Sequence, residues 1–567
     1  MKILLLTQAF NSLSQRLYVE LCQRGHQVSV EFDINDRVSI EAVALFRPDL
    51  IVAPFLKRAI AREIWANHIC LVVHPGIKGD RGPSALDWAI LNGERHWGVT
   101  LLQANAEMDA GDIWATETFP MRQATKASLY RNEVTEAAVR TVLTAIGHLQ
   151  QGGFEPEPLD YANHDVRGTP RPLVRQADRA IDWRRDDSQT VLRKIRSGDG
   201  FPGVADRLFG RDCFLHDAHH EPSLGGRPGE VIARSGPAIC RATVDGSIWI
   251  GHLRDSQGAH PFKLPATRVL ADETAHLPEA GGYPEISYRE RSGVGYLHFH
   301  FYNGAMSRHQ CERLREAFAS ARSRDTRVIV LMGGSDFWSN GLHLNLIEAA
   351  ASPADESWLN INAINDLARD IITTQSHVTI SALQGNAGAG GVFLARAADL
   401  VWARSGVILN PHYKDMGNLY GSEYWTYLLP KRVGDERAVR ITQGRLPMGC
   451  GEAFELGLVD ACFACGHGEF VSVLEREAEL LAVDPGWEEM LAEKIRRRAM
   501  DELERPLERY REQELSRMKR NFYGFDPSYH VARYNFVYKV PKSRTPVTIA
   551  RHRDLRRASD RIGKKRS

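Results

Sequence analysis

The chain has 567 residues, enough for roughly three or four domains, and its 43% hydrophobic and 25% charged residues are typical of globular proteins. Its 72 Lys and Arg against 71 Asp and Glu give a formal net charge of +1, which excludes nucleic-acid binding through an overall excess of positive charge. There is no apolar run of about 18 residues, and the one near Met1 is too short for a secretory signal. We therefore expect a cytoplasmic protein without membrane contact.

Strand-like and helix-like patterns alternate over the first part of the chain. Residues 2–6, 28–32, 49–53 and 70–74 are short apolar runs, separated by segments with helical spacing. This alternation predicts an open parallel sheet. A stretch rich in Gly, Pro and polar residues follows and indicates a linker, so we place the first domain at residues 1–170.

Three further regions follow. Short strands with Gly-containing turns predict a small β-barrel, which with its linker occupies residues 171–280. A second α/β pattern covers residues 285–480, and charged helical sequence with a basic tail covers 481–567. The last eighteen residues hold eight Lys and Arg against two Asp, which indicates either a solvated end or contact with ligand phosphates.

The eight cysteines are scattered and show no disulfide-like framework. Cys462, Cys465 and His467 lie close together in "CFACGH", but a structural zinc site usually needs a second ligand pair, and the sequence offers none. We expect thiols here and no metal.

The first candidate site is centred on His74. This residue ends a predicted strand, where open α/β sheets bind their ligands. A loop containing Gly76 and Gly82 follows, and the later turn "MDAGD" carries Asp109 and Asp112. A His and a carboxylate can act as an acid–base pair, although such a pair alone is more often structural.

These motifs resemble the folate-dependent formyltransferases, whose pattern is Asn-x-His-x-Ser-Leu-Leu-Pro, then Gly-Val-Thr, then Asp-x-Gly. His74, the "GVT" at 98–100 and Asp109 match in order and spacing, and the segment beginning "IDWRRDD" resembles the start of the barrel in methionyl-tRNA formyltransferase. Over residues 1–275 the resemblance implies that N10-formyltetrahydrofolate binds beside the Gly/Pro loop and "MDAGD". It also implies that His74 and Asp109 manage protons during formyl transfer.

One position departs from the formyltransferase pattern. The Asn two residues before the His, which donates a hydrogen bond to the formyl oxygen, is Val72 here. Loss of one such donor costs on the order of 3 kcal/mol of transition-state stabilisation. Either another group donates, or the acceptor is more nucleophilic than an amine or water, as a thiol is.

The glycine-rich stretch "LQGNAGAGGVFLARAADLVWA", residues 383–403, precedes a helical pattern. It lacks the Lys-Ser/Thr of a P-loop and the GxGxxG of a dinucleotide fold. With Asn303, "FWSNGLHL" and "GEAFELGLVD", it resembles the crotonase (enoyl-CoA hydratase/isomerase) superfamily over residues 290–480. The resemblance implies an oxyanion hole for a CoA thioester, formed by the N–H groups of Leu342 and Gly390. We expect Gly341 to lie beside the CoA and Asn303 to orient the CoA or the loop around it.

The side chains differ from those of a hydratase. One hydratase Glu position is Phe393, and the other aligns with Tyr413 or, as the second choice, His412. Glu423 follows ten residues after Tyr413. Each residue alone could equally be an ordinary loop residue, but opposite an oxyanion hole they become acid–base candidates.

The two modules and the loop "NPHYKDMGNLYGSEYW" together resemble maturation factors of [NiFe] hydrogenases that supply the active-site carbonyl ligand. This implies formyl transfer from N10-formyltetrahydrofolate to coenzyme A, then decarbonylation of formyl-CoA to CO and CoA. We expect Glu423 to be the base and Tyr413 the acid, with the reverse roles open. The implied partners are small-molecule substrates and other hydrogenase maturation proteins.

Three alternatives remain at this stage. Phe393 disfavours an acyl-CoA hydratase or isomerase, and Val72 disfavours a tRNA or sugar-nucleotide formyltransferase. A non-catalytic maturation scaffold is the third. The expected fold is a multidomain α/β protein with a Rossmann-like formyltransferase sheet, an OB-like barrel, a crotonase-type ββα domain and a helical C-terminal region.

Overall fold

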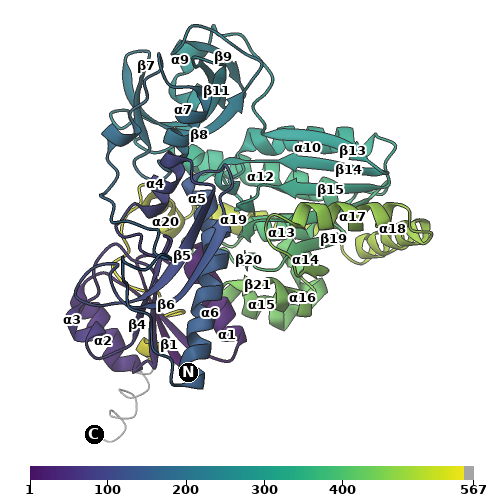
Figure 1. Ribbon diagram of the computed structural model, residues 1–567. Helices are drawn as coiled ribbons and strands as arrows, with labels where there is room; N and C mark the ends of the chain where they lie inside the picture. Colours follow the sequence, from purple (N-terminus) through teal and green to yellow (C-terminus); the bar gives the residue numbers. More distant parts are fainter. Residues whose placement is uncertain (555–567) are drawn as a thin grey trace, which may run out of the picture. The chain divides into compact units, whose positions relative to one another are not determined.

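The computed structural model describes residues 1–554, and the chain divides into two compact units (Figure 1). The first unit comprises Met1–Tyr283 together with the described residues from Lys542 onward, and the second unit comprises Pro284–Pro541. Most of the predicted basic tail, residues 555–567, lies outside the described part of the chain.

The first unit contains a six-stranded sheet in the order β2-β1-β3-β4-β5-β6. The strands are β1 (Lys2–Thr7), β2 (Gln27–Phe32), β3 (Leu50–Phe55), β4 (Cys70–His74), β5 (His96–Gln103) and β6 (Ile113–Pro120). The first four are parallel as expected, but β5 runs antiparallel to both β4 and β6, so the sheet is mixed. The turn that joins β5 to β6 leaves β5 beside Cys70, at the start of β4, and carries Asp109, whose carboxylate comes to 3.6 Å from His74 at the end of β4.

Helices cover this sheet on both faces (Figure 1). The helices α1 (Ser12–Gln23) and α6 (Thr135–Gln151) pack against each other on one face, and α2 (Asp36–Phe46) and α3 (Arg62–Trp65) lie on the other. The α1 helix begins where the Asn11 side chain accepts a hydrogen bond from the Ser14 N–H. The shorter helices are α4 (Ala85–Asn92), α5 (Lys126–Leu129) and the π-helical turn η1 (Tyr130–Val134).

A second, antiparallel sheet of the first unit has the order β7-β8-β11-β10-β9, with β12 paired to β11. Its strands are β7 (Val204–Leu208), β8 (Arg211–Glu221), β9 (Val231–Ser235), β10 (Ala238–Ala242), β11 (Ser247–Arg254) and β12 (Leu264–Pro265). The helix α7 (Ser188–Ser197) packs its buried Val191, Leu192 and Ile195 onto this sheet. This is the small β-domain that the sequence predicts. The remaining short helices are η2 (Gln176–Arg179), α8 (Ala266–Val269) and α9 (Ala271–Thr274).

The second unit is built from two sheets, and three strands of the shorter sheet each follow a strand of the longer one, whereas the fourth precedes the last strand of the longer sheet. The longer has the order β13-β14-β15-β17-β19-β22, from β13 (Ile286–Arg291), β14 (Val294–Phe299), β15 (Val328–Gly333), β17 (Val378–Leu383), β19 (Leu400–Arg404) and β22 (Ala461–Phe463). The shorter contains β16 (Phe337–Ser339), β18 (Asn386–Gly388), β20 (Ile408–Asn410) and β21 (Met448–Gly449). Repeated strand pairs followed by helices confirm the crotonase-type ββα fold.

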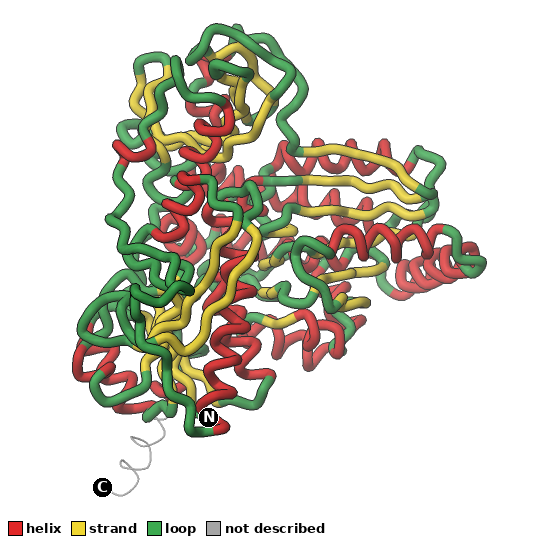
Figure 2. The backbone as a smooth tube through the Cα atoms, viewed as in Figure 1, coloured by secondary structure: helices red, strands yellow, loops and turns green. Residues whose placement is uncertain are grey.

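Helices lie on both faces of the longer sheet (Figure 2). Residues that alternate along its strands therefore face different helices. Leu297 and Leu331 pack toward α10 (Arg308–Arg322) and α12 (Pro353–Ile372), whereas Tyr296 and Val330 pack toward α17 (Phe470–Ala482). The remaining helices are η3 (Tyr302–Gly304), α11 (Leu344–Glu348), α13 (Gly390–Arg396), α14 (Trp425–Val433), α15 (Asp435–Gly444), α16 (Cys450–Glu455), α18 (Trp487–Glu504), α19 (Leu507–Tyr523) and α20 (Ser528–Val537). The last three form the helical C-terminal region that the sequence predicts.

After α20 the chain returns to the first unit and covers the outer edge of β2. The Val30 N–H donates to the Ile549 carbonyl at 3.0 Å. Beside this contact the buried Glu31 carboxylate faces His552 and Arg553, each at 2.7 Å, and also accepts a hydrogen bond from Thr545. We call residues 545–553 the C-terminal strap.

The sequence predicts a thiol at Cys462, and this prediction is wrong. The structure pairs Cys450, at the start of α16, with Cys462 on β22, and their Cα atoms are 6.0 Å apart. The two elements pack against each other, so residues that show no pairing pattern along the sequence become neighbours. Across residues 1–554 no cluster of three or more potential metal ligands is found.

None of the helices in residues 1–554 combines the length and the apolar character that crossing a membrane requires.

Candidate active sites

In the first unit His74 ends β4, as the sequence predicts, and its side chain is 4% exposed. Two carboxylates face its ring. Nε2 lies 3.0 Å from Oδ1 of Asp80, and Nδ1 lies 3.6 Å from Oδ1 of Asp109. The distance to Asp80 is that of a hydrogen bond, whereas the distance to Asp109 is too long for one. Asp80 was not among the residues singled out from the sequence, although it stands in the same loop.

The loop after His74 depends on two glycines. An added Cβ at Gly76 would stand 2.5 Å from Nε2 of His74 and 2.7 Å from Oδ1 of Asp80, so any side chain there would disrupt the pair. Gly82 has a φ of +117°, a left-handed conformation that favours glycine, and its N–H donates to Oδ2 of Asp109 at 3.2 Å. Both predicted glycines therefore shape the surroundings of His74.

The segment interpreted as a linker lies against this loop. The Gly168 N–H donates to the Lys78 carbonyl and the Arg171 N–H donates to the Arg81 carbonyl, both at 2.9 Å. An added Cβ at Gly168 would stand 1.9 Å from the backbone nitrogen of Asp80. The linker therefore has no helix or long strand, but it forms one wall of the site.

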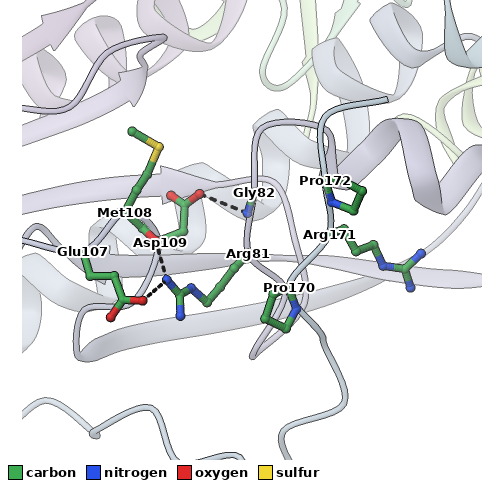
Figure 3. Close-up of a pocket in the computed structure, with 8 residues that line it drawn as sticks. All are labelled: Arg81, Gly82, Glu107, Met108, Asp109, Pro170, Arg171 and Pro172. Atoms are coloured by element: carbon green, nitrogen blue, oxygen red, sulfur yellow. Dashed lines mark hydrogen bonds and ion pairs between the residues drawn. The ribbon is translucent and has the colours of Figure 1, made fainter. Parts of the chain in front are cut away.

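A pocket of about 440 Å³ opens beside Asp109 (Figure 3). Arg81 lines it and donates to Oε1 of Glu107 at 2.6 Å and to the Met108 carbonyl at 3.1 Å. The hydrogen bond with Glu107 raises the pKa of Arg81. The other lining residues are Gly82, Asp109, Pro170, Arg171 and Pro172. Asp109 thus connects His74 to a pocket with cationic side chains.

Two other positions of the first site were singled out from the sequence, Val72 as a departure from the formyltransferase pattern and Asp112 as a ligand candidate. Val72 lies two positions before His74 on β4 and packs against apolar neighbours, so it supplies no hydrogen-bond donor. Asp112 is exposed just before β6, and its backbone carbonyl accepts from the Gln103 N–H at 2.9 Å. A ligand contact of Asp112 stays a prediction.

In the second unit the glycine-rich turn lies beside Gly341, which follows the end of β16 by two residues. Gly390 is the first residue of α13, and the N–H groups of a first helical turn have no acceptor within the helix. An added Cβ at Gly341 would stand 3.5 Å from the Gly390 nitrogen, so the two backbones are adjacent. Leu342 follows Gly341 directly and is half-buried. The structure brings the two residues of the predicted oxyanion hole to neighbouring backbone segments.

The two predicted acid–base residues form one pair. The Tyr413 hydroxyl lies 2.6 Å from Oε2 of Glu423 and 2.9 Å from the Ser422 carbonyl. Both side chains are buried, and an added Cβ at Gly390 would stand 2.1 Å from Oε1 of Glu423. The carboxyl group therefore lies directly over the glycine at the start of α13.

Burial determines the electrostatics of this pair. It raises the pKa of Glu423 to about 7, against the hydrogen bonds from Tyr413 and the Ser422 N–H, which lower it. Burial and the nearby Glu423 charge raise the pKa of Tyr413 well above its ordinary value. Near neutral pH Glu423 is therefore divided between its protonated and ionised forms, whereas Tyr413 keeps its proton, which it shares with Glu423 in their hydrogen bond.

Phe393 fills the place of a hydratase carboxylate. Its ring is fully buried and stacks on that of Tyr413, with centroids 5.5 Å apart and planes 16° from parallel. The first turn of α13 is therefore apolar at this position, and an apolar side chain cannot activate a water molecule.

A buried network behind Glu423 was not singled out from the sequence. Oδ1 of Asn365 accepts the Glu423 N–H at 2.9 Å, and the Ser422 hydroxyl donates to Glu514 at 3.2 Å. Glu514 also accepts hydrogen bonds from the backbone of Tyr424 and from Thr426. These contacts hold the turn at Glu423 and Tyr424, where φ is 59° and 58°.

Two remaining candidates lie at the margin of the second site. Asn303 is exposed with a φ of 55°, and its carbonyl accepts from Nδ2 of Asn340 at 2.8 Å. His412 is buried next to Tyr413, and burial lowers its pKa. A contact of Asn303 with CoA stays a prediction.

The fold and the two sites define a formyltransferase-type unit joined to a crotonase-type unit. The chain matches the formyl transferase family over residues 16–146, its C-terminal domain over 173–260, and the enoyl-CoA hydratase/isomerase family over 289–529. It is 26% identical to the methionyl-tRNA formyltransferase of Citrifermentans bemidjiense, over 45% of this chain and 78% of that protein.

Two relatives match the whole chain. It is 57% identical to the hydrogenase maturation factor HoxX of Bradyrhizobium diazoefficiens, over 99% of each chain. The crystal structure of HypX from Aquifex aeolicus in complex with tetrahydrofolic acid superposes with a TM-score of 0.94 at 49% identity, covering 98% of this chain and 99% of that one. The chain belongs to the HypX (HoxX) family of hydrogenase maturation factors, which confirms the resemblance drawn from its motifs.

Proposed function

We propose that this protein makes carbon monoxide for [NiFe]-hydrogenase maturation. In the first reaction the formyl group of N10-formyltetrahydrofolate passes to the thiol of coenzyme A. In the second, formyl-CoA is split into CO and CoA. The observation that carries the proposal is the buried Tyr413–Glu423 pair over Gly390, a proton-transfer pair beside an oxyanion site in which Phe393 replaces the hydratase carboxylate.

The first unit would perform formyl transfer. The pocket beside Asp109 would hold the folate, in keeping with the tetrahydrofolic acid bound to the Aquifex aeolicus relative. His74 would take the proton of the incoming thiol and return it to N10 as the C–N bond breaks. A thiol acceptor accords with Val72, because a stronger nucleophile depends less on the missing hydrogen bond to the formyl oxygen.

The second unit would perform decarbonylation, which needs no oxidant or reductant. The N–H groups of Leu342 and Gly390 would polarise the formyl carbonyl. Glu423 would take the formyl proton while the C–S electron pair leaves with sulfur, and Tyr413 would protonate that sulfur. The proton on Glu423 would then return to Tyr413 across their 2.6 Å contact, which restores the starting state.

Carbon-13 labelling tests the proposal directly. Purified protein receives N10-formyltetrahydrofolate labelled in the formyl carbon, with and without CoA, and haemoglobin traps any CO. We expect labelled CO in amounts equal to the tetrahydrofolate released, with CoA acting catalytically. Labelled formate as the sole one-carbon product, or equal CO without CoA, would contradict the proposal. The proposal also includes delivery of the CO to other hydrogenase maturation proteins.

A further inference from the structure

We propose that Asp80 is the positioning residue that fixes the tautomer of His74, so that Nδ1 faces the pocket side as the proton acceptor for the thiol. This inference rests on the proposed formyl transfer and assigns a residue to it. Its starting point is the hydrogen-bond distance of 3.0 Å between Oδ1 of Asp80 and Nε2 of His74, beside the 3.6 Å between Asp109 and Nδ1.

The chemistry of the groups determines where the His74 proton lies. An ionised carboxylate only accepts hydrogen bonds, and a neutral imidazole has one N–H and one bare nitrogen. With Asp80 ionised and His74 neutral, the 3.0 Å contact places the proton on Nε2. The bare Nδ1 then faces Oδ1 of Asp109 at 3.6 Å, a distance too long for a hydrogen bond and one that two acceptors can keep.

The surroundings of Asp80 suit a positioning role. Its side chain is fully buried, so the carboxylate cannot turn into solvent. Gly76 leaves room for its contact with His74, and Gly168 of the linker packs onto its backbone nitrogen. Its second oxygen, Oδ2, has no hydrogen-bond partner and lies 3.8 Å from Nε of Arg171. Asp80 is thus held by packing on several sides, with His74 as its one hydrogen-bonded side-chain contact in the described residues.

Asp109 occupies a different position. Its side chain is 13% exposed, it lines the pocket, and its Oδ2 already accepts the Gly82 N–H at 3.2 Å. It is therefore placed beside the reacting groups, whereas Asp80 lies on the opposite side of the imidazole ring. The two carboxylates therefore have different roles. Asp80 orients the imidazole ring, and Asp109 faces the proton that Nδ1 receives.

The proton transfers balance in this arrangement. The thiol proton moves to Nδ1 of His74 while sulfur attacks the formyl carbon, and the imidazolium lies between two carboxylates. The C–N10 bond then breaks, and N10 takes the proton from Nδ1. Tetrahydrofolate and formyl-CoA are the products, and the Nε2 proton stays with Asp80 throughout.

The tautomer can be measured without any turnover. Protein labelled with nitrogen-15 in histidine is examined by long-range nitrogen–carbon-bound-proton correlation, which separates the two neutral tautomers, and the His74 signals are assigned by their loss in His74→Gln. We expect the proton on Nε2 in the parent and a changed pattern in Asp80→Asn. A proton on Nδ1 in the parent would overturn the inference, whether or not formyl transfer is observed.

Kinetics test the consequence. Asp80→Asn should lower kcat for tetrahydrofolate release on the order of 10²–10⁴-fold, since an amide can stabilise the wrong tautomer. The KM for formyl-folate should stay within about threefold, because Asp80 does not line the pocket. Asp165→Asn makes the same chemical change at an exposed position of the linker that packs against the Asp80 loop, and it serves as the matched control.

The choice of thiol separates proton removal from general damage. The ratio of the parent rate to the Asp80→Asn rate should be at least tenfold smaller with a thiol that is already ionised at the assay pH than with CoA. An equal loss with both thiols, or a kcat within threefold of the parent, would overturn the inference. A parent protein that gives no tetrahydrofolate with CoA would instead contradict the proposed function, and the tautomer measurement would still decide the role of Asp80.

Discussion

Glu423 and Tyr413 are the residues on which the second reaction depends most directly. Glu423→Gln and Tyr413→Phe keep the shape of each side chain and remove its proton. Each should lower CO release on the order of 10²–10⁴-fold, the usual contribution of a general acid or base. Tetrahydrofolate release should continue, because His74 and its carboxylates belong to the other unit. CO trapping with haemoglobin, with tetrahydrofolate followed in parallel, separates the two steps.

Both variants releasing CO at the parental rate would remove the pair from the mechanism. His412 would then be the next residue to change, since it is buried beside Tyr413. Loss of both reactions in either variant would indicate damage to the fold and not to one step.

The pH dependence of CO release reports which member of the pair is the base. Burial raises the pKa of Glu423 to about 7, and a base must be ionised to accept the formyl proton. We therefore expect the decarbonylation rate, measured from supplied formyl-CoA, to rise as pH increases through about 7 and then level off. A rate that falls over this range would assign Glu423 as the acid.

The same shift gives a stability prediction. The pKa of Glu423 rises from 4.5 to about 7 on folding, so its contribution to stability is fully present below pH 4.5 and is lost as pH rises through about 7. The contribution is on the order of 3 kcal/mol. The free energy of unfolding of the second unit should therefore fall between pH 5 and 8 in the parent, and less so in Glu423→Gln. Urea unfolding at several pH values measures the difference.

Among the elements, the start of α13 is the most sensitive to substitution. In Gly390→Ala the new methyl group would stand 2.1 Å from Oε1 of Glu423, so the carboxyl group must move off the oxyanion site. We expect CO release to fall at least 100-fold, the scale of losing an oxyanion contact. Gly451→Ala in α16 is the matched control, because no heavy atom lies within 4 Å of its added Cβ. Equal CO release from both variants would contradict the placement of the site at Gly390.

Elements and motifs that are continuous in sequence could be predicted. Residues 2–6, 28–32 and 70–74 lie within β1, β2 and β4, residues 49–53 overlap β3 from Leu50 onward, and the glycine-rich turn precedes α13. Those predictions rest on the local spacing of apolar residues and glycines, which follows directly from the backbone geometry of strands, helices and turns. The direction of β5 could not be predicted in this way, because strand pairing depends on partners that a local pattern does not specify.

The same limit applies to the sites. Tyr413 and Glu423 are ten residues apart and could be paired by motif, but Glu514 reaches Ser422 from 92 residues away within a charged helical segment that carries no motif. Asp80 is only six residues from His74 and was within reach. An acidic residue inside a glycine-rich loop was the available signal, and the formyltransferase pattern directed attention to Asp109 instead.

At the scale of the whole molecule, the first unit is assembled from two distant parts of the chain. The C-terminal strap adds to the edge of β2. The cost of burying the Glu31 carboxylate is offset by its contacts with Thr545, His552 and Arg553. Burial acts to raise the pKa of Glu31, but the hydrogen bonds from His552 and Thr545 and the charge of Arg553 lower it overall. The stability that Glu31 contributes is therefore present above its unfolded pKa and is lost as pH falls, opposite to Glu423.

Glu31→Gln should loosen the strap. The variant loses the charge that His552 and Arg553 face, so we expect amide hydrogen exchange in Gln27–Phe32 to quicken at least tenfold, equivalent to about 1.4 kcal/mol. Exchange in β17 of the second unit should be unchanged. Glu155→Gln, at an exposed position, is the control. Unchanged exchange in β2 would mean that the strap does not depend on this carboxylate.

The strap also sets the order in which the protein can be completed during translation. Glu31 and His552 are 521 residues apart, so β2 leaves the ribosome roughly half a minute to two minutes before the segment that covers it. Throughout that interval the nascent first unit has a bare strand edge, the kind of surface through which chains pair wrongly. The unit synthesised first is therefore the unit finished last, after all of Pro284–Pro541 has been made.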